Sequence, residues 1–385
     1  MKPKDAGINT LCTHYGELED EQFKGVVSPL YMSTSYAYDE VPVKRYPRYF
    51  NSPNQEALGK KIAALEHTEA ALIFSSGMAA TSTAIMAFLK QGDHLVISRQ
   101  TYGGTQNLLQ EEFGKYGIEY TFVDGVSVAE YQAGIRPNTK LLFLETPSNP
   151  LLYITDLKEL SALAKSHGLL TLIDNTFASP VNQNPADFGI DVVIHSATKY
   201  MGGHSDISAG AVAASHEHIK QIFSLAKNLG GNLSEYTVWL LERSLKTMGL
   251  RVKAQNENAL LLSRYLATHP AIKQVFYPGL ESHPGFDIAK SQMRAYGGML
   301  SFEPVAEVDL KIFQNSLTWV RASMSLAGVE STLTVPAQTS HALLTPEQRK
   351  EAGIGDSLIR FSAGIEEFED LRDDLNRALT MAIKA

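Results

Sequence analysis

The sequence has little cysteine: Cys12 is the single one among 385 residues. One cysteine excludes an intramolecular disulfide and is typical of a protein from a reducing compartment. Runs of about 18 consecutive apolar residues are also missing, so no membrane-spanning helix is predicted. The N-terminus has no apolar core behind its first charged residues, so a secretory signal is not expected. These absences together predict a cytoplasmic protein with no membrane partner.

Positive charge is in short supply as well. The chain carries 34 lysines and arginines against 42 aspartates and glutamates, for a formal net charge of −8, and no run rich in Lys and Arg stands out. Surfaces that bind nucleic acid are basic, so a nucleic-acid partner is not expected. With 44% hydrophobic residues the composition is ordinary for a globular protein, and the length predicts more than one hydrophobic core.

Short apolar runs alternate with amphipathic stretches between residues 69 and 210. The runs short enough to be buried strands are 70–74, 94–98, 141–144, 169–173 and 191–194. Helical patterns occupy 79–89 and 156–167. This alternation predicts a mostly parallel sheet with helical crossovers, an α/β fold.

The texture of the chain changes on either side of this region. Residues 1–45 show no sustained period and are expected to form an extended arm, followed by a large domain at 46–234. A long amphipathic helix is predicted from 235 to about 268, where it would bridge to a small C-terminal α+β domain at 235–385. The predicted strands of the small domain are 275–279, 298–302 and 358–361.

Polar side chains follow two of the predicted strands. Asp174 comes directly after 169–173, and Ser196, Thr198 and Lys199 come after 191–194. Ligands of α/β sheets bind at the carboxyl ends of the strands. A lysine for an aldehyde, an acid for a ring nitrogen and hydroxyls for a phosphate are the groups that pyridoxal phosphate needs. On this stretch alone, two core strands with ordinary polar ends remain an equal alternative.

The sequences DNTF from Asp174 and SATKYMGGHSD from Ser196 resemble the signature of a known family. It is the cystathionine gamma-synthase, cystathionine gamma-lyase and methionine gamma-lyase group of pyridoxal-phosphate enzymes in cysteine and methionine metabolism. The resemblance extends from about Ser28 to the last helix. It implies an aspartate-aminotransferase-like fold of type I, with pyridoxal 5'-phosphate bound by Lys199 and its ring nitrogen held by Asp174.

The resemblance assigns further residues to the cofactor. Gly77 and Met78 lie where a predicted strand turns into a helix, and free amides at a helix N-terminus bind anions. They match the family's phosphate cradle. Tyr102 matches the tyrosine that stacks on the cofactor ring and assists proton transfer. Asn149, in the motif ETPSNP, matches an asparagine beside the cofactor's phenolic oxygen and the substrate.

The arm is expected to lie on another subunit, because an extended aromatic-rich segment cannot bury itself. Tyr46 and Arg48 at its end fit the family's Tyr-x-Arg motif, which crosses to the partner's cofactor phosphate. The match is imperfect, since one extra residue separates Arg48 from Pro53 and Asn54 replaces a threonine. The resemblance implies a homo-oligomer, a dimer of dimers, with active sites shared between subunits.

Substrate residues are also implied by the resemblance. Arg360, which opens the motif RFSAGIE, matches the arginine that clamps the substrate α-carboxylate, and Ser325 matches the serine that supports it. Asn107 and Met324 stand where many cystathionine enzymes carry Arg and Glu for a distal charge. A neutral, apolar pocket favours a short thioether tail. Arg45 is the alternative, as a cation that could hold a distal carboxylate.

Three functions remain open on the sequence. We favour a carbon–sulfur lyase that acts by elimination on methionine, cystathionine or a related amino acid to give a keto acid, ammonia and a thiol. The second is a gamma-replacement transferase of the cystathionine gamma-synthase or O-acylhomoserine sulfhydrylase type. The third is a non-catalytic relative with the same fold. No metal site is expected, because His195 and His204 beside Lys199 have no acid or thiol to complete a ligand set.

Overall fold

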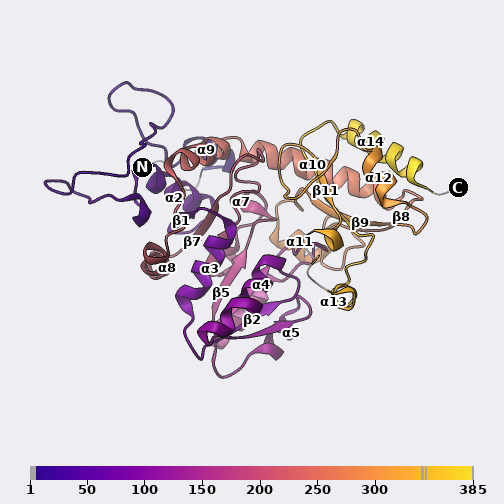
Figure 1. Ribbon diagram of the computed structural model, residues 1–385, viewed down its shortest axis with the longest axis horizontal. Helices are drawn as coiled ribbons and strands as arrows, with labels where there is room; N and C mark the ends of the chain where they lie inside the picture. The colour runs from indigo at the N-terminus through magenta and orange to yellow at the C-terminus, as the bar shows by residue number, and fades with distance from the viewer. Residues whose placement is uncertain (1–5, 340–341, 343–344, 384–385) are drawn as a thin grey trace.

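The computed structural model describes residues 6–339, 342 and 345–383, which build two β-sheets and the helices around them (Figure 1). The strands of the larger sheet are β1 Ala70–Phe74, β2 His94–Ser98, β3 Glu119–Val123, β4 Thr139–Glu145, β5 Leu170–Asp174, β6 Val192–His195 and β7 Gly210–Ala214. Those of the smaller sheet are β8 Ile272–Phe276, β9 Met299–Pro304, β10 Arg321–Ala322, β11 Thr332–Thr334 and β12 Ile359–Ser362.

The helices follow the strands in alternation through the first half of the chain. They are α1 Ile8–His14, α2 Pro53–Leu65, α3 Gly77–Phe88, α4 Gly103–Glu112, α5 Val128–Gly134, α6 Leu157–Ser166, α7 Ser179–Asn182, α8 His216–Leu229, α9 Glu235–Leu245, α10 Met248–Ala267, α11 Phe286–Gln292, α12 Leu310–Ser316, α13 Pro346–Glu351 and α14 Phe368–Ala382. Short 3-10 turns are η1 Pro47–Tyr49, η2 Phe113–Tyr116, η3 Pro185–Phe188 and η4 Pro336–Gln338.

The larger sheet has the strand order β1-β7-β6-β5-β4-β2-β3. Strands β6, β5, β4, β2 and β3 run parallel, whereas β7 is antiparallel to both β6 and β1. The prediction of a mostly parallel sheet is therefore confirmed. Because parallel strands end at the same edge, the residues that follow β4, β5 and β6 meet there.

Both faces of this sheet are buried, which explains the unbroken apolar runs in its sequence. Alternate residues of the central strands point to two different cores: Ile97 and Phe143 pack with helices α3, α4 and α8, while Val96 and Leu142 pack with α5 and α6. A strand with polar residues on one face could not occupy this position. The interior of the sheet is thus apolar, and its polar side chains lie mainly where the strands end.

The smaller sheet has the order β10-β11-β12-β9-β8, and α10 connects it to the larger one. The N-terminal half of α10 places Met248 and Val252 in the core under the large sheet. Its C-terminal half places Leu262 and Leu266 in the core of the small sheet, together with α14. Figure 1 shows the helix running from one part of the molecule to the other. This is the bridging helix that the sequence predicts.

One prediction for this region is wrong: residues 235–268 form two helices, α9 and α10, and not one. The break lies at Lys246 and Thr247. In a continuous helix the Ser244 carbonyl would accept from the amide four residues later. Here it accepts instead from the amide and the hydroxyl of Thr247, both at 3.3 Å, and from the guanidinium of Arg251 at 2.9 Å. Contacts from Thr247 and from the Arg251 side chain, seven residues further along the chain, have replaced the helical hydrogen bond.

The predicted arm is extended only in part. Its first described residues form α1, which buries Leu11 and Cys12 against α2 and α10. From Gly16 to Tyr46 the chain has neither helix nor strand, and Figure 1 shows it as loops that stand away from the body. The large apolar side chains exposed on these loops are Phe23, Val26, Val27, Tyr31, Met32, Tyr38 and Val43. Across the described residues, no helix combines the length and the apolar character that crossing a membrane requires.

Candidate active site

Lys199 lies in a tight turn that follows β6 at the carboxyl edge of the large sheet. The Lys199 amide donates to the Ser196 carbonyl at 3.1 Å, and the Gly203 amide donates to the Lys199 carbonyl at 2.7 Å. Gly203 has a φ of +69°, a value that favours glycine. The turn therefore holds the backbone of Lys199 at a fixed place and frees its side chain to leave the sheet edge.

The amine of Lys199 is only partly solvated. Its Nζ donates to the Ser325 hydroxyl at 2.6 Å. The pKa of the amine is lowered to about 8, first because burial penalises its charged form and then because the Arg360 guanidinium lies nearby, while Asp174 opposes both effects. A substantial neutral fraction near neutral pH makes this lysine a nucleophile and a base.

Two carboxyl groups lie side by side at the ends of neighbouring strands. Asp174 on β5 is in register with Glu145 on β4. Burial raises the pKa of Asp174, and the hydrogen bond from the Thr176 amide at 3.0 Å opposes the rise. Burial, and then Asp174 itself, raise the pKa of Glu145 well above its ordinary range. A cation placed beside Asp174 would lower the cost of its charge.

Glu145 is a site residue that the sequence reading missed. It is buried, and its carboxylate accepts from the backbone amide of Tyr102 at 2.7 Å. Glu145 so fixes the start of α4, where Tyr102 stands. The signal available in the sequence was its position as the last residue of an apolar run, one strand away from Asp174. The Tyr102 ring lies over Gly104, where a Cβ atom would come within 2.5 Å of the ring.

The N-terminus of α3 lies where β1 ends. The Ser76 hydroxyl caps α3 by accepting from the Ala79 amide at 3.1 Å, so the first amides of the helix, those of Gly77 and Met78, have no acceptor within it. A Cβ atom on Gly77 would lie 2.8 Å from the Cβ of Ser196, so only glycine fits. The helix N-terminus and the Ser196 hydroxyl are therefore adjacent, as a phosphate requires.

Thr198 is differently placed from Ser196. Its hydroxyl donates to the Ala209 carbonyl at 3.1 Å and accepts from the Ala209 amide at 3.0 Å. The donor of this side chain is thus already used to join the Lys199 turn to the start of β7. Only its remaining lone pair is available to a ligand, which makes Thr198 the weaker of the two predicted phosphate residues.

Arg360 on β12 approaches the same site from the small sheet. It is 6% exposed, and no ion pair involves it in the part of the chain that the structure describes. One guanidinium nitrogen donates to the Asn149 side-chain oxygen at 3.0 Å and another to the Ser325 carbonyl at 3.4 Å. Burial lowers the pKa of Arg360 to about 10, although Tyr102 and Glu145 oppose this. A buried guanidinium without a carboxylate partner is a binding site for one.

The loop that carries Met324 and Ser325 lies over this arginine. Ser325 has a φ of +78° and Ala327 a φ of +64°, unusual values for residues other than glycine that often mark functional loops. The Ala327 amide donates to the Ser362 hydroxyl at 2.7 Å and anchors the loop. Met324 is 76% exposed, and Asn107 is exposed on α4. Among the described residues, neither contacts Lys199.

The arm residues Tyr46 and Arg48 are not part of the site within this chain. The Arg48 guanidinium lies over the rings of Tyr46 and Tyr49, at 5.5 and 4.9 Å from their centroids, and donates to the Lys227 carbonyl. Arg45 forms an ion pair with Glu56 at 2.9 Å. In the described part of the chain, none of these side chains contacts Lys199.

The described residues contain no group of three or more His, Cys, Asp or Glu side chains that could hold a metal ion. His195 is buried, and its ring is paired with the carboxylate of Glu66, which also accepts from Asn175 at 3.1 Å. The remaining constellation fits pyridoxal phosphate. Four groups meet at one edge of the sheet: the desolvated amine of Lys199, the carboxyl group of Asp174, the helix N-terminus at Gly77 and the unpaired guanidinium of Arg360.

Comparisons with known proteins agree with this geometry. The model of a family described as Cys/Met metabolism PLP-dependent enzyme matches residues 9–380. A cystathionine gamma-lyase of Bacillus subtilis (strain 168) is 42% identical over 374 residues, which cover 96% of this chain and 98% of that protein. An L-methionine gamma-lyase of Fusobacterium nucleatum is 38% identical over 394 residues, covering 98% and 99%. The crystal structure of a cystathionine gamma synthase from Xanthomonas oryzae pv. oryzae superposes with a TM-score of 0.93 at 38% identity, covering 98% of both chains.

Proposed function

The chain belongs to the Cys/Met metabolism PLP-dependent enzymes, and from this premise we propose that it is a carbon–sulfur lyase acting on methionine, cystathionine or a related sulfur amino acid. The products are a keto acid, ammonia and a thiol. Two neighbouring side chains carry the proposal. Arg360 is a buried cation without a carboxylate partner, and the amine of Lys199 has a lowered pKa. Together they offer a carboxylate clamp and a base for one amino acid.

The cofactor, pyridoxal 5'-phosphate, would be held by residues at the ends of four strands, β2, β4, β5 and β6, and at the N-terminus of α3. They are Lys199 for the aldehyde, Asp174 for the ring nitrogen, Tyr102 and Asn149 for the ring and its oxygen, Gly77, Met78, Ser196 and Thr198 for the phosphate, and Tyr46 and Arg48 supplied to the partner's phosphate. When bound, the cofactor provides an electron sink for the bonds at the substrate Cα.

The protein's own residues then orient the substrate and move its protons. The guanidinium fork of Arg360 binds the α-carboxylate, and Asn149 and the Ser325 carbonyl keep the fork in place. This aims the Cα–H bond at the Lys199 amine, which takes the proton and later returns one to Cβ or to the leaving sulfur. Tyr102, whose backbone amide is held by Glu145, would lie against the cofactor ring and would assist these transfers.

The outer end of the site favours a neutral tail. Met324 is apolar and Asn107 is uncharged, so neither can neutralise a distal carboxylate or ammonium. Arg45, the cation that could do so, is engaged with Glu56 in this chain. Methionine is therefore the preferred substrate in this proposal. Gamma-replacement is the second candidate, favoured by the likeness to a cystathionine gamma synthase at 38% identity.

We also propose a cytoplasmic homotetramer, built as a dimer of dimers with shared sites. The arm supports it, because apolar side chains such as Phe23, Val26 and Met32 stay exposed in the single chain. Tyr46 and Arg48 support it too, since they would serve no site unless they reach a second subunit.

A substrate panel tests the function. Methionine, cystathionine, cysteine and O-acyl-homoserine with a thiol are supplied separately, and keto acid, ammonia and thioether are measured. Keto acid and ammonia from methionine, at a higher specificity constant than from cystathionine, are expected. Thioether formation from O-acyl-homoserine as the fastest reaction would instead identify a transferase.

A further inference from the structure

Arg251 is a buried arginine whose hydrogen-bond partners are neutral. It lies on α10, is 5% exposed, and forms no ion pair in the part of the chain that the structure describes. Its Nη1 donates to the Tyr200 carbonyl at 2.9 Å, and its Nη2 donates to the Ser244 carbonyl at 2.9 Å and the Met201 carbonyl at 3.4 Å. Two of these three carbonyls belong to the residues directly after Lys199.

The turn that carries Lys199 needs such a partner. It is a single hydrogen-bonded turn, closed by the Gly202 amide on the Ala197 carbonyl at 2.8 Å and by the Gly203 amide on the Lys199 carbonyl. The carbonyls of Tyr200 and Met201 come at its end, where no following helical amide reaches them. A cation at the C-terminal end of a turn satisfies such carbonyls, and a planar fork can hold two at once.

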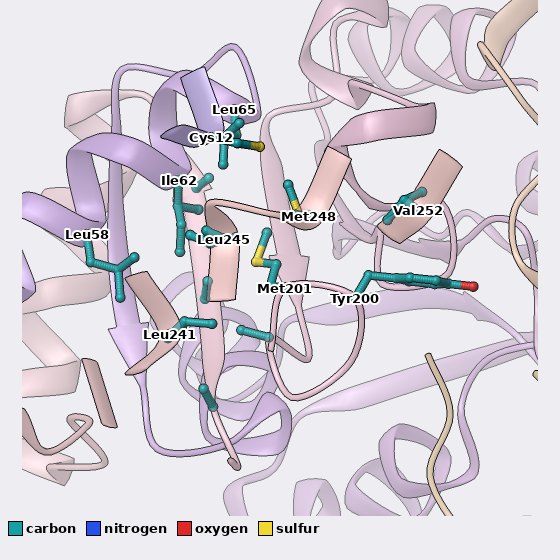
Figure 2. Close-up of a cluster of buried hydrophobic side chains, with 14 of the residues drawn as sticks. Cys12, Leu58, Ile62, Leu65, Tyr200, Met201, Leu241, Leu245, Met248 and Val252 are labelled. Atoms are coloured by element: carbon teal, nitrogen blue, oxygen red, sulfur yellow. The ribbon is translucent and has the colours of Figure 1, made fainter. Parts of the chain in front are cut away.

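The guanidinium of Arg251 is packed closely against the turn. Tyr200 and Met201 are buried in the same core as Met248 and Val252, the residues of α10 on either side of Arg251, and Figure 2 shows the four together. Opposite them, a Cβ atom on Gly203 would lie 1.8 Å from Nη1 of Arg251. The guanidinium therefore fills the space between α10 and the turn, with glycine as the only residue that admits it.

We propose that Arg251 is a positioning residue for Lys199. By holding the carbonyls of Tyr200 and Met201, it fixes the direction in which the Lys199 side chain leaves the turn, toward Ser325 and the cofactor site. The inference rests on the proposed function, because it takes Lys199 as the residue that bonds to the cofactor aldehyde. Without Arg251 the turn samples several directions, and the amine meets the aldehyde carbon less often.

The test measures how fast the cofactor attaches to Lys199, a step in which Nζ bonds to the aldehyde carbon and the aldehyde oxygen leaves as water. Cofactor-free wild type, Arg251→Lys and Gly203→Ala are mixed with pyridoxal 5'-phosphate, and the visible absorbance is followed by stopped flow. Attachment should be about tenfold slower in both variants, because small misplacements of a reacting group are costly. The kcat should fall while KM stays within about twofold, because Arg360 is untouched.

Controls separate positioning from stability. Arg264→Lys alters an exposed arginine of the same helix and should leave the attachment rate unchanged. Thr247→Val removes the hydroxyl that accepts from Arg251 Nε at 3.2 Å and donates to the Ser244 carbonyl at 3.3 Å, and it offers a milder variant that should slow attachment about threefold if the other two do not fold.

An unchanged attachment rate in a folded Arg251→Lys or Gly203→Ala variant would overturn the proposal, and if those two do not fold, the same result in Thr247→Val would do so. This holds even if the melting temperature falls, because lower stability with an unchanged attachment rate indicates a purely structural residue. A wild-type protein that attaches no cofactor at Lys199, as shown by borohydride fixation and peptide mass analysis, would instead refute the proposed function. Slower attachment in the variants on a normal wild-type background supports the positioning role alone.

Discussion

Replacement of Arg360 by lysine is expected to weaken binding of the substrate carboxylate selectively. Arginine offers two parallel hydrogen bonds to a carboxylate, whereas lysine offers a point charge, and each charge-assisted bond contributes about 1.5 to 3 kcal/mol. The variant also leaves the buried Asn149 oxygen, now 3.0 Å from the guanidinium, without its donor, at a cost of about 1 kcal/mol. The two losses together come to about 2.5 to 4 kcal/mol, or roughly 60- to 700-fold in affinity.

Two inhibitors that differ only in the carboxylate isolate this effect. Norleucine carries the amine, the carboxylate and an apolar tail without sulfur, and pentylamine is the same molecule without the carboxylate. Inhibition constants against the preferred substrate should rise by the expected factor for norleucine and by less than about twofold for pentylamine. Arg321→Lys, an exposed arginine on β10, is the matched control. Equal losses for both inhibitors would show that Arg360 supports the fold of the site and does not bind the carboxylate.

Three further predictions concern the lysine, the subunit boundary and the outer pocket. The pKa of the Lys199 amine is about 8 in the cofactor-free protein, and the neutral amine is the reactive form. Attachment of pyridoxal 5'-phosphate should therefore accelerate up to about pH 8 and level off above it; a rise that continues toward pH 10 would contradict the lowered pKa. Mixing Arg48→Ala with Lys199→Ala should restore activity, since a mixed dimer contains one intact site; recovery no greater than the sum of the parents, after proven subunit exchange, argues against sharing. Met324→Glu should shift the ratio of specificity constants from methionine toward cystathionine, and a wild-type preference for cystathionine that disappears in Arg45→Ala would refute the neutral tail.

The parts of the fold that the sequence could predict are those that local pattern determines. The runs at 70–74 and 94–98 became β1 and β2 without a shift, and those at 141–144, 169–173 and 191–194 became β4, β5 and β6 with ends moved by one or two residues. A strand buried on both faces has an apolar pattern that needs no tertiary information. By contrast, β7 consists of Gly210, three alanines and one valine, and only the valine has a high strand propensity. Its place between β1 and β6 is what makes it a strand.

The site divides in the same way. Lys199, Asp174 and Arg360 stand in recognisable motifs, and the structure brings all three to one edge of the sheet. Glu145 stands out in the sequence only as the last residue of an apolar run, because its relation to Asp174 exists only in the pairing register of β4 and β5. Arg251 was missed for a similar reason: its partners in the Lys199 turn, Tyr200 and Met201, lie 51 and 50 residues away along the chain. A lone arginine in a helical pattern also suggests a solvated side chain.

Because α10 packs in two cores, we expect the two lobes of the molecule that it joins to unfold as one thermodynamic unit. A helix of 20 residues spans about 30 Å, and it is stiff over that length. Unfolding of either core would remove the packing of half of α10 and fray the other half of the helix. Heat should therefore unfold both lobes in a single calorimetric transition. Arg360 lies on one lobe and Lys199 on the other, so the two residues are expected to be brought together or separated in the same transition. We therefore expect no populated intermediate in which one lobe is folded and the other is unfolded.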